Sequence, residues 1–600
     1  MSIIGSHTLR YGFAGRLYRE NYWDQGNSSG TFTFGTNWTE GPLSTSAGAP
    51  MGQSMASFLY GLPASGGITD PYANSYAEQS KIAAFYLQDD WKISPKLTAS
   101  FGLRYELPTP LTERYNRSVQ GWNPNATDPL AAQVLAKYAQ NPISQIPVSQ
   151  FNVAGGLSFP AVGGDSRNLY PASNKNFMPR FGLAYHVTEK TVIRAGAGFF
   201  FEPIGVINVH SNQEGFAGST LMVPSLDNGL TFAASLTNPF PNGFLPPVAG
   251  PTTYYGQNIT FFNQNLKNPY DMRWSLAVQR QLPWNSVLEV TYVGNKAVRL
   301  RLPRDLNTIP RQYLSTLSTR DQATINLLNS QVTNPFYPLL PGTGLASATV
   351  PIYQLLLPHP QYVGGMTIDT NQGYSWYHAL EVRAEKRLSS GLTTTLSYSW
   401  SKLMEGMDFK NPSDTMPERV ISPQDRTNRI SWTVLYALPF GEGQRWASSV
   451  KPLNTMISGW QFESIYAIQT GQALGFGDAL FVGDTNTIAL PSDKRSVQHW
   501  FNTSGFVTAS SQQLANNIQT LPTAFSYIRG DGQNQEDLSF LKNTQIKENM
   551  RLQFRAEAIN AFNHPQFLAP NTTPTSTAFG QVTTEWSWPR VIQFGLKLQF

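Results

Sequence analysis

Hydrophobic and polar side chains alternate with a period of two along several segments of the chain. Between 96 and 106, one side carries Leu97, Ala99, Phe101, Leu103 and Tyr105, and the other carries Thr98, Ser100, Gly102, Arg104 and Glu106. Segment 392–401 repeats the pattern, and so does 592–600, where the chain ends on the apolar side. Because successive side chains of a strand point to opposite faces, the pattern predicts strands with one apolar and one polar face.

The same alternation predicts fifteen strands. They cover 6–19, 30–38, 77–92, 96–106, 176–187, 191–202, 270–281, 286–296, 373–388, 391–404, 425–439, 457–471, 534–546, 549–563 and 590–600. Most have the roughly 9–11 residues that a tilted membrane strand requires. The sequence therefore predicts an all-β fold, a large antiparallel transmembrane β-barrel.

The connections between these strands are of two kinds. Short turns are expected at Ser94-Pro95, Thr188-Glu189-Lys190, Pro283-Trp284-Asn285, Ser389-Ser390 and Glu548, whereas 107–175, 203–269, 297–372, 472–533 and 564–589 are long. Outer-membrane barrels have short periplasmic turns and long extracellular loops. If the last strand descends to the periplasm, 6–19 also descends and residue 1 lies outside the cell. We therefore expect an odd number of strands to be missing before Met1.

Composition narrows the class of protein. No run of about 18 apolar residues is present, which excludes ordinary transmembrane helices but not strands. The chain has no cysteine, so disulfides, thiolate metal sites and cysteine nucleophiles are excluded. The formal charge of +5 is spread without a basic block, so no nucleic-acid partner is expected. Residues 1–7 lack the features of a signal peptide, and we expect a fragment or a mature form.

Seven short sequence segments resemble those of a known protein family. The segments concerned are Gln88-Asp89-Asp90-Trp91-Lys92, Gly102-Leu103-Arg104-Tyr105-Glu106, Phe177-Met178-Pro179-Arg180-Phe181-Gly182-Leu183-Ala184-Tyr185, Ser375-Trp376-Tyr377-His378-Ala379-Leu380-Glu381, Ser397-Tyr398-Ser399-Trp400-Ser401-Lys402, Phe562-Asn563-His564-Pro565 and Pro589-Arg590-Val591-Ile592-Gln593-Phe594-Gly595-Leu596. Together they resemble barrel strands of TonB-dependent receptors, and in particular the Oar-like branch. The resemblance covers essentially residues 1–600.

The resemblance implies a larger protein than this chain. Such receptors carry an N-terminal regulatory-like domain, a plug with a TonB-contacting box and a barrel of about 22 strands. Fifteen strands would be the C-terminal portion of that barrel, with seven strands, the plug and the regulatory-like domain absent. The TonB system would then act only through the missing plug. Since an open sheet would leave unpaired edges in lipid, we expect this chain alone to be unstable.

Two groups of apolar-face residues are candidate sites. The closing strand resembles the signal read by the barrel-assembly machinery, which points to Phe594, Leu596, Leu598 and Phe600. Amphipathic rings near strand ends favour the lipid headgroup level. The predicted aromatic girdle comprises Tyr105, Tyr185, Tyr292, Tyr398, Trp400 and Tyr436.

Charged residues on the polar faces form a third group. We expect them to line a wet lumen, where charge costs little, with opposite signs paired across strands. They are Arg104, Glu106, Arg194, Glu381, Arg383, Glu385, Arg555, Glu557 and Lys597. In the family such a wall also contacts the plug and the passing substrate.

No catalytic, cofactor or metal site is predicted. Ser399 and Lys402 fit the S-x-x-K spacing, but a strand does not bring them together as a helix would. Arg529-Gly530-Asp531 is an adhesion-like tripeptide in an expected loop, and the seven histidines lack metal-ligand spacing.

Three functions remain open at this point. The first is an outer-membrane receptor or transporter whose loops bind an unidentified external ligand and whose barrel holds a gated passage. The alternative is a surface adhesin or structural barrel without active transport. The third is a soluble all-β enzyme, which the absence of a catalytic constellation disfavours. The expected location is the outer membrane of a Gram-negative bacterium, in contact with its lipid.

Overall fold

The computed structural model describes residues 1–24, 26–39, 53–69, 75–216, 218–227, 229–245, 249–441, 444–447, 450–547 and 549–600. Fourteen long strands dominate it, with lengths from 9 residues (β27) to 24 residues (β18). They are β2 (His7–Tyr22), β5 (Tyr76–Ser94), β6 (Leu97–Pro108), β10 (Asn176–Thr188), β11 (Thr191–Phe201), β14 (Tyr270–Leu282), β15 (Ser286–Asp305), β18 (Met366–Ser389), β19 (Leu392–Gly406), β21 (Asn428–Ala437), β22 (Trp460–Gln469), β25 (Gln533–Lys547), β26 (Met550–Ile559) and β27 (Val591–Gln599).

Short elements lie at the strand ends and in the connections. The strands are β1 (Ser2–Ile4), β3 (Thr31–Thr33), β4 (Ser65–Thr69), β7 (Thr112–Glu113), β8 (Gly121–Asn123), β9 (Gly156–Ser158), β12 (Ser219–Leu221), β13 (Ile259–Thr260), β16 (Gln331–Thr333), β17 (Thr349–Pro351), β20 (Val420–Ile421), β23 (Ala473–Leu474) and β24 (Phe525–Arg529). The helices are α1 (Gln53–Leu59), α2 (Ala131–Tyr138), α3 (Gln322–Asn329), α4 (Ile352–Leu356) and α5 (Lys451–Ile457). None of these helices has the length and apolar composition of a membrane-spanning helix.

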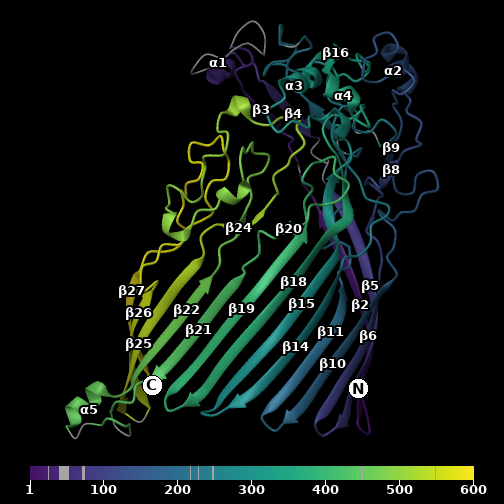
Figure 1. The fold of residues 1–600 in the computed structure, drawn as a ribbon. Helices are drawn as coiled ribbons and strands as arrows, with labels where there is room; N and C mark the ends of the chain where they lie inside the picture. Colours follow the sequence, from purple (N-terminus) through teal and green to yellow (C-terminus); the bar gives the residue numbers. More distant parts are fainter. Residues whose placement is uncertain are drawn as a thin grey trace.

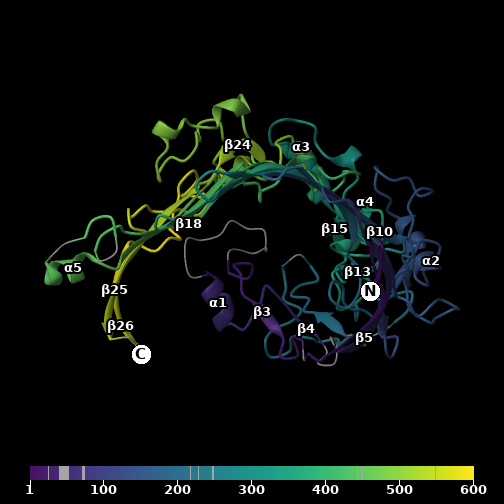
Figure 2. The ribbon, with the colours of Figure 1, turned by 90° about the horizontal axis from the view of Figure 1, so that it is seen from below.

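The long strands form one antiparallel meander. Starting from β1, each strand pairs with the next along the chain, through β2, β5, β6, β10, β11, β14, β15, β18, β19, β21, β22, β25 and β26 to β27. The strands are tilted side by side in Figure 1, and Figure 2 shows that they curve into an arc. In the part of the chain that the structure describes, no strand pairs with the outer edge of β27. The sheet is therefore open.

Connection lengths separate the two ends of the sheet. Tight turns join β5 to β6, β10 to β11, β14 to β15 and β18 to β19 at one end, which we call the turn end. The turn expected at Glu548 lies outside the described residues. At the β14–β15 turn both Trp284 and Asn285 have positive φ, near 60°, as a two-residue type I′ hairpin turn requires. The long connections gather at the opposite, loop end (Figure 1). One longer connection, which contains α5, departs from the predicted pattern because it lies at the turn end.

Fourteen of the fifteen predicted strands are confirmed, and the one at 30–38 is wrong. There only Thr31–Thr33 forms a strand, which pairs with β4 in a small separate sheet. An apolar residue of that segment makes a local contact instead. Phe34 packs edge-on against Phe58 of α1, with 5.1 Å between ring centroids.

The predicted direction of strand 6–19 is also wrong. The strand β2 that covers it starts at the tight turn after β1 and runs toward the loop end, where the long connection to β5 begins. Consequently Met1 lies near the turn end and not among the long loops (Figure 1). The meander still has the predicted total of fifteen strands, but only because it includes the short strand β1, which was not predicted, and lacks 30–38.

The long connections are packed structures with their own cores. Helices α2, α3 and α4 share one buried cluster that includes Tyr138, Phe151, Leu328 and Leu355. Rings of Phe476, Phe501 and Phe506 form a second cluster in the connection between β22 and β25. These apolar residues occur at irregular spacing, so alternation does not reveal them. The loop end is therefore a folded cap, not a set of structureless loops.

Candidate functional site

The two faces of the sheet differ in chemistry, and the strand register shows which residues share each face. In an antiparallel pair, residues directly opposite each other lie on the same face. One row joins Leu276, Tyr292, Leu380 and Trp400 across β14, β15, β18 and β19. The neighbouring row carries Thr291, Glu381 and Ser399. One face is thus apolar and the other polar, as the alternation predicts.

The apolar face is the convex one. Trp400 and Leu380 border a hollow whose other wall includes Ser526 and Arg529 of β24. Figure 2 places β24 outside the arc of the sheet, whereas α1, β3 and β4 lie inside it. The polar face is therefore concave and faces the space that the arc partly encloses.

All nine charged residues expected in the lumen lie on the concave face. Arg104 and Glu106 are bonded at 2.5 Å within β6, Arg383 and Glu385 at 3.3 Å within β18, and Arg555 and Glu557 at 3.7 Å within β26. These three pairs run along a strand, not across strands as predicted. Residues two positions apart on a strand point to the same face, and the long arginine side chain can reach a carboxylate at that distance.

The remaining concave charges differ in their partners. Arg194 reaches from β11 over β14 to Glu289 of β15, at 3.6 Å, and also donates to Gln279 at 2.6 Å. Glu381 and Lys597 form no ion pair among the residues that the structure describes. The concave wall therefore keeps both paired and unpaired charge.

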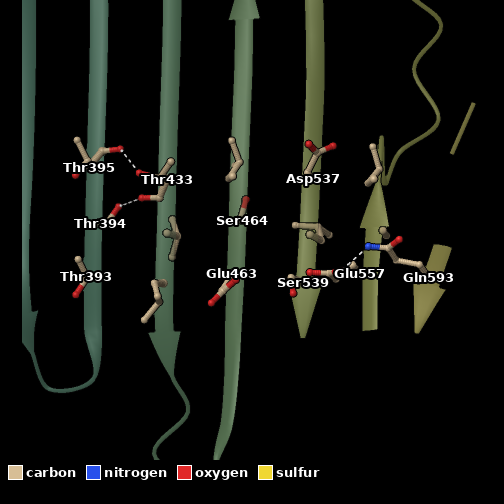
Figure 3. A pocket seen from close by; sticks show the side chains of 16 residues that line it. Thr393, Thr394, Thr395, Thr433, Glu463, Ser464, Asp537, Ser539, Glu557 and Gln593 are labelled. Atoms are coloured by element: carbon tan, nitrogen blue, oxygen red, sulfur yellow. Dashed lines mark hydrogen bonds between the residues drawn. The ribbon is translucent and has the colours of Figure 1, made fainter. Parts of the chain in front are cut away.

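A hollow on the concave face was not predicted from the sequence. Its volume is about 420 Å³, and Figure 3 shows its lining across β19, β21, β22, β25, β26 and β27. One register row crosses it, from Thr393 through Leu435, Glu463, Ser539 and Glu557 to Gln593. Asp537 lies in the adjacent row, opposite Ile465.

Three carboxylates, Glu463, Asp537 and Glu557, line this hollow beside apolar side chains. Glu557 accepts a hydrogen bond from the Gln593 amide at 2.6 Å, and Asp537 accepts one from the backbone N–H of Asn560 at 2.8 Å. Glu463 has no bonded partner in the described part of the chain. The sequence could have placed two of these carboxylates on the polar face. Glu463 and Asp537 lie in the predicted strands 457–471 and 534–546, at positions that alternate with the apolar residues.

A second cluster, at the loop end, joins residues far apart in sequence. The fully buried carboxylate of Glu78 accepts hydrogen bonds from the Ser211 backbone N–H and hydroxyl, at 2.8 and 3.0 Å, and meets His210 Nδ1 at 2.8 Å. Glu20 lies 3.7 Å from His210. The contacts fasten the segment after β11 to the loop end of β2 and β5.

The predicted girdle residues all lie on the convex face, at different levels between the turn end and the loop end. Tyr185 and Tyr436 are close to the turn end of β10 and β21. Tyr105 lies toward the loop end, where its ring stacks on Phe177 with centroids 4.4 Å apart and its hydroxyl donates to the Asn174 carbonyl. Counted from the adjoining turns, Tyr292 is the seventh residue of β15, and Tyr398 and Trp400 are the seventh and ninth residues of β19, so these three lie between the two ends of the sheet.

The closing strand is the most exposed of all. The exposed fractions of Phe594, Leu596, Leu598 and Phe600 are 73%, 70%, 46% and 94%. Phe594 stacks on Phe554 of β26, on the convex face. These four side chains thus project from the free edge of the sheet, where another structure can contact them.

Two motifs weighed in the sequence have structural explanations. Ser399 and Lys402 lie on opposite faces of β19, so the serine and lysine cannot act as a catalytic pair. Arg529 of the adhesion-like tripeptide donates to the carboxylate of Asp425 at 2.8 Å, and Asp531 accepts from the Phe567 backbone N–H at 3.0 Å. Both charged ends of the tripeptide are therefore occupied within the fold.

Solved structures similar to this chain are outer-membrane proteins. The outer membrane transporter YddB from Escherichia coli is 11% identical with a TM-score of 0.41, and the match covers 100% of this chain and 61% of that one. For the FrpB iron transporter from Neisseria meningitidis (F3-3 variant) the values are 10%, 0.40, 100% and 53%. For the ferripyoverdine receptor of the outer membrane of Pseudomonas aeruginosa they are 9%, 0.36, 88% and 39%. The chain thus spans less than two thirds of these proteins.

Comparison by sequence gives one family. No curated protein sequence matches this chain. Residues 1–593 match the family described as outer membrane beta barrel domain, which is nearly the whole chain. Together with the antiparallel sheet, this match shows that the chain is a β-barrel protein of the Gram-negative outer membrane and belongs to the outer membrane beta barrel domain family.

Proposed function

We propose that the chain is the C-terminal barrel portion of a TonB-dependent receptor of the Oar-like kind. Its loop cap binds an unidentified external ligand, and the space behind the concave face forms part of a gated passage. The sequence segments that resemble this branch, from Gln88 to Leu596, support the label. The mechanism is binding and gating, not bond chemistry.

The observation that carries this proposal is the concave polar wall. It extends across fourteen long strands and includes the hollow of Figure 3 with its three carboxylates. A barrel of about eight strands is just wide enough to be filled by its own side chains, whereas wider barrels enclose a channel or a plugged lumen. A wall this broad and polar fits a water-filled or plug-filled passage.

An adhesin or structural barrel is the alternative. The folded loop cap would suit it, because adhesion needs only an external binding surface and a membrane anchor. Such an anchor, however, needs no charged wall behind its lipid face. The tripeptide that would favour adhesion also gives little support, because the charged side chains of Arg529 and Asp531 are bonded within the fold.

The energising parts of the receptor would lie in sequence that precedes Met1. The free edge of β27 and the part of the β2 edge that β1 leaves unpaired support this placement, because unpaired strand edges are costly in lipid. Seven further strands would complete a barrel of about 22 strands. Reading the gene upstream of residue 1 tests the proposal. A plug with a TonB-contacting box is expected, and an unrelated anchor in its place would favour the adhesin.

Single cysteines test whether the concave wall is wet. The chain has no native cysteine, so each substitution creates one unique thiol. Thr395→Cys places it on the concave face and Leu396→Cys places it on the convex face, at neighbouring positions of β19. In outer membranes we expect a charged maleimide to label the first variant at least ten times faster, because a thiol reacts as thiolate and needs water.

Heat-modifiable gel mobility serves as the folding control for both variants. Equal labelling of two folded variants would mean that the faces do not separate water from lipid. Protection of Thr395→Cys would mean that the wall is packed and closed to solutes. Either result would rule out a water-filled passage.

We further propose that Phe594, Leu596, Leu598 and Phe600 are the signal for the barrel-assembly machinery, and that the six aromatic girdle residues lie at the lipid headgroups. Exposure of the closing strand supports the first role. Phe594→Gln with Phe600→Gln is expected to lower the amount of assembled barrel in outer membranes severalfold. Gln599→Ala, on the other face of β27, should leave that amount unchanged. Equal assembly of all variants would contradict the signal role.

A further inference from the structure

Positive charge gathers on the convex face near the loop end, where the apolar surface of the sheet stops. We call Lys296, His378, Lys402 and Arg419 the convex basic band. His378 of β18 is directly opposite Lys402 of β19, and Lys296 of β15 is opposite Trp376, two residues before His378. The guanidinium of Arg419 lies over the Trp376 ring, 4.4 Å from its centroid. Three strands and a loop thus bring four basic side chains around one tryptophan.

Strand length sets the depth of this band. Lys402 is the eleventh residue of β19 counted from Leu392, and Lys296 is the eleventh of β15 counted from Ser286. A tilted strand crosses the hydrocarbon in about 9–11 residues. On the turn side of the band, the convex positions are apolar, as at Leu380 and Val290. The band therefore lies at the outer headgroup level, where the hydrocarbon ends.

The charge of the band is not balanced by the protein. Neither Lys296, Lys402 nor Arg419 is in an ion pair within the described ranges, although fourteen pairs occur there. Two loop carboxylates beside members of the band have other partners. Glu418, which precedes Arg419, bonds to Lys410 at 2.6 Å, and Asp425, which accepts the backbone N–H of Leu403, bonds to Arg529 at 2.8 Å. An unpaired cation beside hydrocarbon is costly, so the site favours an external anion.

A hollow beside Lys402 offers space for such a group. It has a volume of about 390 Å³ and is lined by Tyr292, His378, Leu380, Trp400 and Lys402 together with the chain around β24. It lies between the end of the pairing of β19 with β21, at Trp400 and Asn428, and the start of the pairing of β19 with β20, at Met404 and Ile421. The Tyr292 hydroxyl lies 2.8 Å from His378 Nδ1 and orients that ring.

We propose that the convex basic band binds the phosphate of a phosphorylated lipid in the outer leaflet. The lysines and Arg419 supply positive charge, and the rings of Trp376 and Trp400 lie at the level where aromatic side chains favour headgroups. The hollow beside Lys402 receives the adjoining apolar part of the lipid. The occupant is a lipid and not a soluble anion, because Leu380 and Trp400 continue the membrane-facing surface from the site.

Lipid titration of the protein in zwitterionic detergent tests the proposal. Native mass spectrometry would count bound short-chain phosphatidic acid, with short-chain phosphatidylcholine as the neutral comparison. Removing one positive charge from a headgroup-level site should weaken binding about fivefold, so Lys296→Gln with Lys402→Gln should weaken it roughly 25-fold. Lys92→Gln, a matched loss of an unpaired lysine on the concave face at the turn end, should leave the affinity unchanged.

Each outcome decides the question. Equal affinity of the double variant and the native protein for phosphatidic acid, or an equal loss in Lys92→Gln, would overturn the proposal. Inorganic phosphate that displaces the lipid at equal concentration would show a soluble-anion site and would also overturn it. Heat-modifiable mobility confirms that each variant is folded. The readout is independent of transport, so failure of the proposed receptor function would not affect it.

Discussion

Replacing Val290 by arginine is expected to destabilise the folded barrel by about 2–4 kcal/mol, because the charge would enter the middle of the lipid-facing surface. Val290 is the fifth residue of β15 and is opposite Val278 and Val382 on the convex face. The measurement is the guanidinium midpoint at which the protein in isolated outer membranes loses its heat-modifiable mobility.

The neighbouring residue provides the matched control. Thr291 is on the concave face, where its register partners are Ala277 and the unpaired Glu381. Thr291→Arg adds the same side chain one position along the strand, within reach of that carboxylate, and we expect a change below about 1 kcal/mol. Equal loss of stability in both variants would show that the two faces do not meet different solvents.

Asp425→Asn is expected to cost about 3–5 kcal/mol of local stability, because it leaves a nearly buried arginine without its counter-charge. The exposed fractions of the Asp425 and Arg529 side chains are 0% and 13%. Asp425 also accepts the backbone N–H of Leu403 at 2.7 Å and the hydroxyl of Thr427 at 2.9 Å. Hydrogen exchange of the amides in β20 and β24 would measure the loss.

Two further variants separate the ion pair from the other contacts. Asp425→Asn combined with Arg529→Gln removes both charges and should recover a large part of the stability, since the desolvated cation is gone. Glu289→Gln breaks the exposed pair with Arg194 and should cost about 0–1 kcal/mol. If Asp425→Asn cost no more than Glu289→Gln, the pair would not hold β24 against β19.

The alternation of apolar and polar residues predicted the sheet because lipid lies against one of its faces and water against the other. A strand with lipid on one face and water on the other must alternate apolar and polar side chains. Segments such as 392–401 can therefore be recognised as strands from the sequence. The same rule misled at 30–38, where Phe34 packs against Phe58 within the cap. Alternation reports that one face is buried, but not what covers it. That single error also reversed the predicted direction of β2.

The sites were predictable to different degrees. Parity alone assigned the nine lumen candidates to the concave face. It would also have assigned Glu463 and Asp537 to that face, and Lys296 and Lys402 to the convex face. By contrast, Glu78 and His210 are 132 residues apart, and no local pattern indicates that they meet. Pairing along one strand instead of between strands depends on side-chain reach, which the sequence does not specify.

The shared core of the cap bears on how a ligand could gain entry. Residues 130–153, between β6 and β10, and residues 325–356, between β15 and β18, pack in one cluster around Tyr138, Phe151, Leu328 and Leu355. Two loops with a common interior cannot swing apart without exposing it to water, at a cost that grows with the apolar area uncovered. Any opening above this side of the sheet is therefore a concerted displacement of both loops, pivoting where they leave Pro108, Asn176, Asp305 and Met366.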